Sequence, residues 1–202
     1  SDVYKRQDGD KARQMEPHLS ETVTKALYCE NAGVTSPYEF VIALAENAIA
    51  NGVEIKLNSE VTKIVQKEEY FEVEINQKEI IKSQYVINSA GIYSDAIAKM
   101  AGIDEYDIHA SRGQYIILDK TQNNLANAVI FQVPTKLGKG ILVTSTYHGN
   151  LLIGPNAEEI NDKEDLSTDE DALTHIAELA KKSVPEISLK RALKSFAGNR
   201  PK

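Results

Sequence analysis

The sequence predicts an α/β (α+β) fold, and three observations support this class. An amphipathic helix with marked ends is expected at residues 37–51, and segments with period-two alternation begin directly after it. The third observation is the run 85–95, YVINSAGIYSD, in which a short apolar stretch passes through small residues to the start of a helix. A strand that leads through small residues into a helix brings bare backbone close to a phosphate or nucleotide in many α/β folds.

The helix at 37–51 is indicated by its two ends and by its apolar spacing. Its start carries the S-x-x-E capping box of Ser36 and Glu39, with proline at the first helical position. Apolar residues recur four positions apart along it, so that one face can pack against a core. Gly52 follows the last turn and is expected to end the helix.

Short runs of β-forming residues separated by polar turns predict strands through the rest of the chain. A first group leads as an antiparallel meander into a strand at 85–87, and a helix is expected from Ser94 to residue 101. The first group lies at 53–57, 61–66, 70–75 and 79–81. A second group, after that helix, lies at 113–119, 129–133, 140–145, 151–153 and 189–202.

Three further signals concern the second group of strands. Gly149 and Asn150 are expected to form a hairpin turn before its fourth strand. A second S-x-x-E box, at 167–170, opens a helix that Pro185 ends. The acidic run 158–171 is expected to be a solvated loop and helix start, because carboxylates are favoured at the positive end of a helix dipole.

Composition excludes several function classes. The chain has 202 residues and a net charge of −7, with basic residues interspersed among acidic ones, so no nucleic-acid partner is expected. Its apolar runs fall far short of the roughly 20 residues of a bilayer span, and its polar start lacks a signal-peptide core. The single cysteine, Cys29, fits a reducing compartment, so a cytoplasmic protein is expected. The four histidines lack metal-ligand spacing, so no metal site is expected.

Two segments are candidates for contact with a cofactor. Ser89, Ala90 and Gly91 could approach a ribose or phosphate through their backbone, because glycine lacks a Cβ, or they could form a simple tight turn. Val61 follows a turn between two expected strands. Its backbone could pair with an adenine edge, or it could belong to an ordinary hairpin. The residue types alone leave both alternatives open.

Three residues are candidates for contact with an anionic substrate. Arg112, at the start of a long expected strand, could clamp a carboxylate or phosphate with its bidentate fork, or it could be an exposed cation. His148 could be a general base, because histidine titrates near neutral pH, or a residue that shapes a turn. Arg200, in the G-x-R-P turn, could clamp a substrate anion or be a loop cation.

The order of these segments carries a resemblance to a known family. The capped helix SPYEFVIALAENAIANGVEI is followed by SEVTKI, YVINSAGIYSDAIAKMAG and SRGQYIILDK, and then by VPTKLGKGILVTSTYHGNLLIGPNAEE and FAGNRP. From Met15 to its end, the chain resembles FAD-dependent oxidoreductases of the D-amino-acid-oxidase-like superfamily. Within that superfamily it is most similar to glycerol-3-phosphate dehydrogenases of the anaerobic type, with L-2-hydroxyglutarate oxidases as neighbours.

The resemblance implies a division into domains. Residues 15–105 are expected to be part of an FAD-binding domain of the glutathione-reductase type. Residues 106–202 are expected to be a substrate-binding domain, a mostly antiparallel sheet with flanking helices, truncated at the C-terminus. Residues 1–14 are expected to be a non-native or disordered start. The family begins with a G-x-G-x-x-G unit that is absent here, so we expect a fragment that is inactive and binds FAD weakly by itself.

The resemblance also implies roles for the candidate residues. Val61 would contact the FAD adenine through its backbone. Three neighbouring residues would line the cofactor near its ribose and pyrophosphate: Ser89, Ala90 and Gly91. Arg200 would bind the anionic group of the substrate, with Arg112 as a weaker candidate, and His148 would accept the hydroxyl proton.

The implied reaction is the oxidation of a small anionic hydroxy compound, glycerol 3-phosphate, by hydride transfer to FAD. Two alternatives stay open. One is another member of the superfamily that acts on an L-2-hydroxy acid or an amino acid, and the other is a non-catalytic α/β binding domain. A partner subunit that accepts electrons and peripheral association of the parent protein with a membrane are also open.

Overall fold

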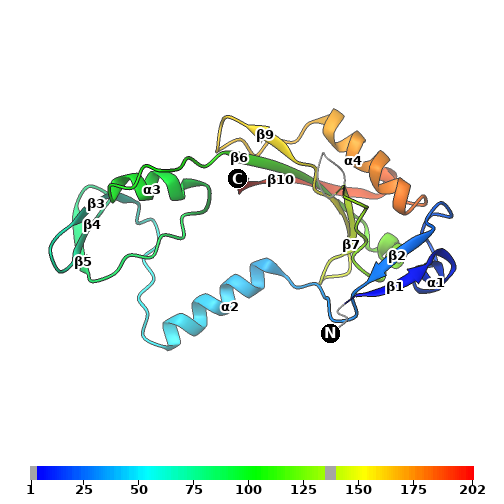
Figure 1. Ribbon diagram of the computed structural model, residues 1–202, viewed down its shortest axis with the longest axis horizontal. Coiled ribbons are helices and arrows are strands. Elements are labelled where there is room, and N and C mark those ends of the chain that lie inside the picture. Colours follow the sequence, from blue (N-terminus) through cyan, green and yellow to red (C-terminus); the bar gives the residue numbers. More distant parts are fainter. Residues whose placement is uncertain (1–3, 135–139) are drawn as a thin grey trace. The chain divides into compact units, whose positions relative to one another are not determined.

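The computed structural model describes residues 4–134 and 140–202 and contains two compact units (Figure 1). Unit 1 comprises Ser1–Phe40, Arg112–Glu158 and Asp165–Gly198. Unit 2 comprises Val41–Ser111, Glu159–Glu164 and Asn199–Lys202. The boundary expected between residues 105 and 106 therefore falls inside unit 2, and residues 15–40 belong to unit 1.

Unit 1 begins with a small sheet that the sequence does not predict. Strand β1 (Lys5–Asp8) pairs antiparallel with β2 (Lys25–Tyr28), and helix α1 (Gly9–Met15) separates them in the chain. The Asp8 carboxylate caps α1 by accepting a hydrogen bond of 2.7 Å from the Lys11 N–H. Residues 5–15 thus form a strand and a helix without apolar periodicity, because backbone pairing and a helix cap do not need it, and the expectation of a non-native or disordered start at 1–14 stays a prediction.

The main sheet has the strand order β10-β6-β8-β7, and β9 pairs with β6 beside this path. Its strands are β6 (Ala110–Leu118), β7 (Leu142–Ser145), β8 (Leu151–Gly154), β9 (Glu158–Ile160) and β10 (Ala192–Pro201). Strands β6 and β8, and likewise β7 and β8, are antiparallel. The expected class, an α/β (α+β) fold with a mostly antiparallel sheet and flanking helices, is confirmed.

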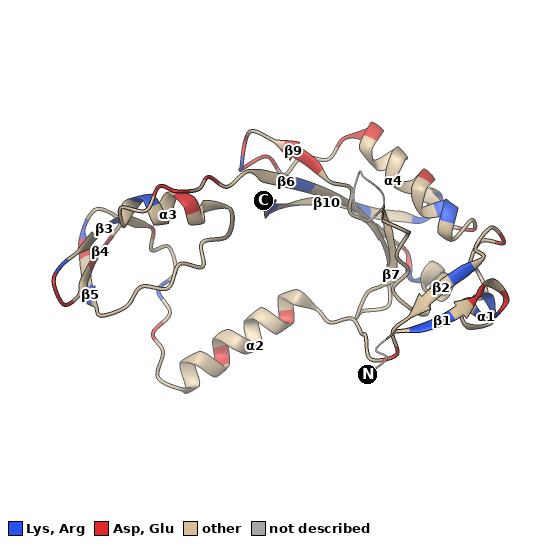
Figure 2. Ribbon diagram, viewed as in Figure 1, with Lys and Arg blue, Asp and Glu red and all other residues tan. Residues whose placement is uncertain are grey.

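The core of unit 1 lies between this sheet and helix α4 (Glu170–Ser183), which packs against β7 and β8. Leu151 and Ile153 alternate along β8 with 0% exposure, and Ile176 and Ala180 lie one turn apart on the buried face of α4. Burial of each large side chain of this kind contributes on the order of 1.5–3 kcal/mol. Helix α4 carries acidic residues in its first turn and basic residues in its last, as the helix dipole favours (Figure 2).

The turn between β7 and β8 is the hairpin that the sequence predicts. The Thr146 N–H donates to the Asn150 carbonyl at 2.7 Å, and Gly149 takes a φ of +82°, which glycine adopts without a Cβ clash. The strand expected at 129–133 is reduced, within the described residues, to one bridge between Ile130 and Val143.

Unit 2 contains the meander that the sequence predicts. Strands β3 (Val61–Gln66), β4 (Phe71–Ile75) and β5 (Glu79–Ser83) pair antiparallel in chain order. The 3₁₀ turn η1 (Gly91–Tyr93) leads into helix α3 (Ser94–Met100), which packs against β3. The small residues therefore lead into a helix as predicted, but residues 85–87 form a loop and not a strand.

Two predicted strands of unit 2 are absent. Residues 53–57 and 85–87 are all described, but they form no strand, and Leu57 and Ile87 are 80% and 88% exposed. An extended apolar segment becomes a strand only when a neighbouring strand pairs with its backbone. Helix α2 (Pro37–Ala50) forms as expected, yet none of its residues, all of which are described, is buried. Across the described part of the chain, no helix has the length and apolar composition needed to cross a bilayer.

Candidate functional site

The loop 88–94 is held closed by the side chain of Asn88. Its Oδ1 accepts a hydrogen bond of 3.2 Å from the Ala90 N–H, and its Nδ2 donates to the Ser94 carbonyl at 2.8 Å. The Tyr106 hydroxyl donates to the same carbonyl at 3.3 Å. The shape of the Ser89-Ala90-Gly91 segment is therefore set by a side chain inside the predicted motif.

The backbone on the outer side of this loop is exposed. Ser89 and Gly91 are exposed, and Gly91 has a φ of +58°, in the left-handed region. A Cβ built at Gly91 would meet no described atom within 4 Å. The backbone at Ser89–Gly91 can consequently be approached closely by a ligand, which is what contact with a ribose or phosphate requires. FAD fits the segment on this criterion.

Asp95, the last residue of the YVINSAGIYSD run, is a buried carboxylate with 7% exposure. Both of its oxygens accept hydrogen bonds of 2.9 Å from the Lys163 ammonium. The N–H groups of Ile108 and Ala96 also donate to it, at 3.1 and 2.9 Å. The bond from Lys163, followed by these backbone donors, lowers the pKa of Asp95 to about 2, so the carboxylate is ionised at neutral pH.

Lys163 connects Asp95 to the G-x-R-P motif. Its ammonium lies 5.9 Å from the centroid of the Tyr93 ring, and its carbonyl accepts a hydrogen bond of 2.9 Å from Asn199 Nδ2. Arg200 follows Asn199 and is exposed on β10. One lysine thus contacts both the start of α3 and the residue beside the predicted anion-binding arginine.

Val61 begins β3 and pairs with Ile75, and a bulge follows between Val61 and Lys63. The residue is half-buried, and it lies in unit 2 together with Ser89–Gly91 and Arg200. A bulge frees backbone groups from the regular ladder. This position is compatible with the predicted adenine contact, which stays a prediction.

Arg112 lies at the centre of an acidic cluster in unit 1. Its guanidinium donates to Glu158 Oε2 at 2.9 Å, Asp165 Oδ2 at 2.8 Å and Ser167 Oγ at 2.6 Å, and its side chain is 7% exposed. Asp169 Oδ2 lies 3.6 Å from the guanidinium. In Figure 2, a basic segment of β6 lies beside an acidic segment of β9. Hydrogen bonding to Glu158 raises the pKa of Arg112 further, so the cation is permanent.

The acidic cluster has a consequence for two predictions. The run 158–171 is only partly a solvated loop, because it supplies the three carboxylates around Arg112 and the strand β9. Gln114 joins the cluster by donating to Asp169 at 2.7 Å. The geometry favours Arg112 as a tie between β6 and the start of α4, and contact with a substrate stays a prediction for this residue.

His148 is exposed in the turn between β7 and β8, with a side-chain exposure of 60%. Its Nε2 lies 3.4 Å from Glu39 Oε1, and its ring meets that of Tyr147 edge to face with centroids 5.3 Å apart. A carboxylate beside an imidazole can orient the ring by hydrogen bonding. The role of His148 as a base stays a prediction.

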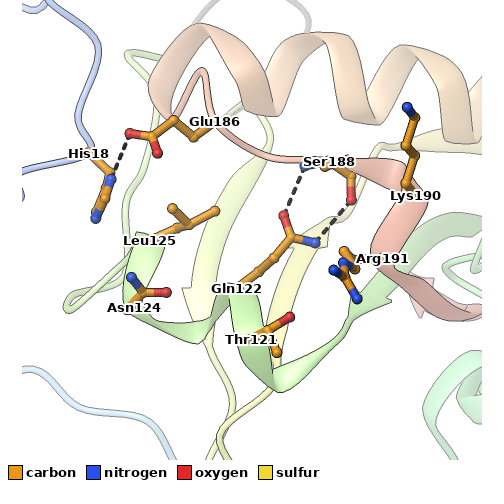
Figure 3. A pocket seen from close by; sticks show the side chains of 9 residues that line it. All are labelled: His18, Thr121, Gln122, Asn124, Leu125, Glu186, Ser188, Lys190 and Arg191. Carbon is orange, nitrogen blue, oxygen red and sulfur yellow. Dashed lines mark hydrogen bonds and ion pairs between the residues drawn. The ribbon is translucent and has the colours of Figure 1, made fainter.

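A separate cavity of about 470 Å³ lies in unit 1 (Figure 3). It is lined by His18, Thr121, Gln122, Asn124, Leu125, Glu186, Ser188, Lys190 and Arg191. Gln122 exchanges two hydrogen bonds of 2.9 Å with the backbone of Ser188, and His18 pairs with Glu186 at 2.7 Å. The predicted site residues all lie elsewhere. Over the described ranges, no cluster of histidine, cysteine or acidic side chains is placed to hold a metal ion.

The structure brings some predicted residues together and separates others. Val61, Ser89–Gly91 and Arg200 belong to unit 2, whereas Arg112 and His148 belong to unit 1. Sequence reasoning missed Lys163 and the structural roles of Asn88 and Asp95. Asn88 and Asp95 stand inside the run that the sequence singles out, but Lys163 stands in an acidic stretch without any motif.

Several known proteins are similar to this chain in sequence. A family model described as FAD dependent oxidoreductase matches residues 2–202. A glycerol 3-phosphate dehydrogenase of Caloramator mitchellensis is 47% identical over 95% of this chain and 40% of its own length. A glycerol 3-phosphate oxidase of Mycoplasma genitalium is 36% identical over 92% of this chain and 49% of its own length.

A solved structure is also similar to this chain. The L-alpha-glycerophosphate oxidase of Mycoplasma pneumoniae with FAD bound superposes with a TM-score of 0.90 and 31% identity, over 99% of this chain and 53% of that one. The chain therefore spans about half the length, or less, of the relatives that it matches.

Proposed function

Because the chain belongs to the family of FAD-dependent oxidoreductases, we propose that it is the part of a glycerol 3-phosphate dehydrogenase or oxidase that contacts FAD and binds the substrate phosphate. The observation that carries this proposal is that the predicted cofactor-contacting segment and the predicted anion-binding arginine lie in the same compact unit. The open backbone at Ser89–Gly91 and the cation Arg200 both belong to unit 2, and hydrogen bonds through Lys163 connect the segments that carry them. The similarity to enzymes of glycerol 3-phosphate supports the choice of substrate.

In this proposal, backbone groups of unit 2 contact the cofactor. Ser89, Ala90 and Gly91 would lie against the ribose and pyrophosphate, where glycine leaves room for close approach, and Val61 would meet the adenine. FAD, when bound, supplies the redox chemistry by accepting a hydride from the alcohol carbon. The protein's own task is to hold the substrate with this carbon in reach and to exclude water.

In this proposal, charged and titratable side chains contact the substrate. Arg200 would bind the phosphate through its planar fork, which matches two phosphate oxygens. His148 would accept the hydroxyl proton as the alcohol becomes a ketone, since an imidazole nitrogen is a common general base. Arg112 is held by three carboxylates of its own chain, so we place its contribution in the stability of unit 1.

A substrate panel on the complete enzyme tests the proposal. Purified protein should be yellow, and anaerobic addition of glycerol 3-phosphate should bleach the absorbance of oxidised flavin. L-2-hydroxyglutarate and D- and L-amino acids, added at the same concentration, should leave it unchanged. Bleaching by one of these compounds instead would give the chain a different substrate, and a colourless protein would favour the non-catalytic binding domain.

The electron acceptor separates two forms of the enzyme. One similar protein is a dehydrogenase and the other an oxidase. Production of hydrogen peroxide in air during turnover would identify oxygen as the acceptor. A reduced flavin that persists in air would identify another acceptor, and we propose a partner subunit in that case.

Replacing Gly91 by alanine should weaken FAD binding by about 10-fold or more, because the new Cβ points into the space over the loop and strains a φ of +58°. The measurement is the dissociation constant of FAD from the complete apoenzyme. Gly102→Ala is the matched control, since Gly102 also has a positive φ, +82°, and open space over its Cα. It should reduce stability by a similar amount without changing FAD affinity. Equal FAD affinities of the two variants would remove Ser89–Gly91 from the cofactor site.

A further inference from the structure

Arg200 lies on a strand segment that is anchored on both of its sides. On one side, Asn199 donates to the Lys163 carbonyl at 2.9 Å. On the other, Lys202 exchanges two backbone hydrogen bonds with His109, of 2.9 and 3.1 Å, and its ammonium pairs with Glu159. The backbone on either side of Arg200 is therefore fixed by groups that belong to unit 2.

Both anchors lead to the same carboxylate. Lys163, which holds Asn199 through its carbonyl, holds Asp95 through its ammonium with two bonds of 2.9 Å. Ile108, the residue before His109, donates its N–H to Asp95 Oδ2 at 3.1 Å. Two separate routes thus run from the neighbours of Arg200 to Asp95 at the start of α3.

Asp95 directly follows the loop 88–94, whose segment Ser89–Gly91 is proposed to face the cofactor; this segment is called the cofactor-facing loop. Asp95 follows Ser94, whose carbonyl is held by Asn88 and Tyr106, and Asn88 also fixes Ala90. The side chains of Asp95 and Lys163 are only 10% and 26% exposed, so solvent screens their attraction little. A displacement of Asp95 or Lys163 would therefore shift Arg200 and Ser89–Gly91 relative to each other.

We propose that Lys163 and Asp95 are positioning residues that hold the phosphate-binding Arg200 at a fixed place relative to the cofactor-facing loop Ser89–Gly91. This inference rests on the proposed function, since it assumes that Arg200 binds the substrate anion. Neither side chain touches the reacting atoms. Their effect is on the place of the Arg200 cation, and therefore both on the affinity for the anion and on the distance between substrate and flavin, to which a reaction rate is sensitive even at displacements of about 1 Å.

The test is a kinetic comparison of variants of the complete FAD-loaded enzyme with glycerol 3-phosphate. Lys163→Met removes the ammonium while keeping an unbranched apolar stem. The expected result is a rise in KM of about 10- to 100-fold with FAD still bound in stoichiometric amount. Lys56→Met is the matched control, because it removes another lysine–carboxylate pair of unit 2, the 2.7 Å contact with Glu79, and the ion pairs of Lys56 in the described residues involve none of the residues that hold Arg200. It should leave KM unchanged.

A double-mutant comparison separates positioning from general stability. If Lys163 acts through Arg200, then Lys163→Met should add little to the loss already caused by Arg200→Ala. Losses that multiply, or a Lys163→Met variant with the KM of Lys56→Met, would overturn the proposal. Lys163→Arg, which keeps the cation, should recover part of the lost affinity.

A second variant keeps the test decisive if Lys163→Met does not fold. Asn199→Ser leaves the Asp95–Lys163 pair in place and removes the amide that reaches the Lys163 carbonyl. A raised KM that is not additive with Arg200→Ala supports the proposal, and an unchanged KM overturns it. Failure of the proposed function looks different, because the unmodified enzyme would then not be reduced by glycerol 3-phosphate. In that event the same variants are compared with the panel compound that does reduce the flavin.

Discussion

Replacing Arg200 by alanine in the complete enzyme is expected to raise the KM for glycerol 3-phosphate by about 10- to 100-fold while FAD stays bound. The reason is the loss of charge-assisted hydrogen bonds to the phosphate, each worth about 1.5–3 kcal/mol, at about 1.4 kcal/mol per tenfold change in affinity. Steady-state kinetics give the KM, and the flavin absorbance of the purified variant gives the cofactor content.

Two controls make this result specific to the phosphate. Arg191→Ala removes an exposed arginine of unit 1 and should leave KM unchanged. Glycerol, which lacks the phosphate, should be a poor substrate of the unmodified enzyme and should not become poorer with Arg200→Ala. Arg200→Lys should be intermediate, since it keeps the charge and loses the fork. An unaltered KM for glycerol 3-phosphate in Arg200→Ala would show that the phosphate is bound elsewhere.

Replacing Arg112 by methionine is expected to lower the free energy of unfolding by about 2–3 kcal/mol without a comparable rise in KM. The change leaves Glu158, Asp165 and Asp169 facing one another without their shared cation. A completely buried pair would cost about 3–5 kcal/mol. These carboxylates are 36–49% exposed, so water compensates part of the loss.

Urea or thermal unfolding of the complete enzyme measures this effect. Arg112→Lys should recover part of the stability, because an ammonium keeps the charge but cannot bond several carboxylates in one plane. Lys190→Met, which removes an exposed cation of the same unit, is the control and should change stability little. Unchanged stability together with a strongly raised KM would return Arg112 to the substrate site.

Local strand pairing explains which parts of the fold the sequence predicts. Strands β3, β4 and β5 are neighbours both in the chain and in the sheet, so their alternation and turns carry all the information that their pairing needs. Residues 53–57 and 85–87 have equally good β patterns, yet in the described residues they lie unpaired and exposed. A pattern along the chain cannot state whether a neighbouring strand is present.

The same distinction applies to the site. The run YVINSAGIYSD predicts the loop and the helix start, because small residues and a helix start are consecutive in it, although its residues 85–87 form no strand. Lys163 lies 68 residues from Asp95, and its surroundings are a polar loop without a motif. The residues that accept hydrogen bonds from Arg112 lie 46–55 residues away from it. Such contacts depend on the tertiary fold, so sequence reasoning names Arg112 without its partners and misses Lys163.

The most direct test of the account is the crystal structure of the complete enzyme with FAD and glycerol 3-phosphate bound. We expect the backbone of Ser89–Gly91 to contact the cofactor, and the Arg200 guanidinium to lie within about 3 Å of a phosphate oxygen. The Asp95–Lys163 pair should remain between them. A phosphate bound by other cations, with Arg200 directed into solvent, would contradict the account.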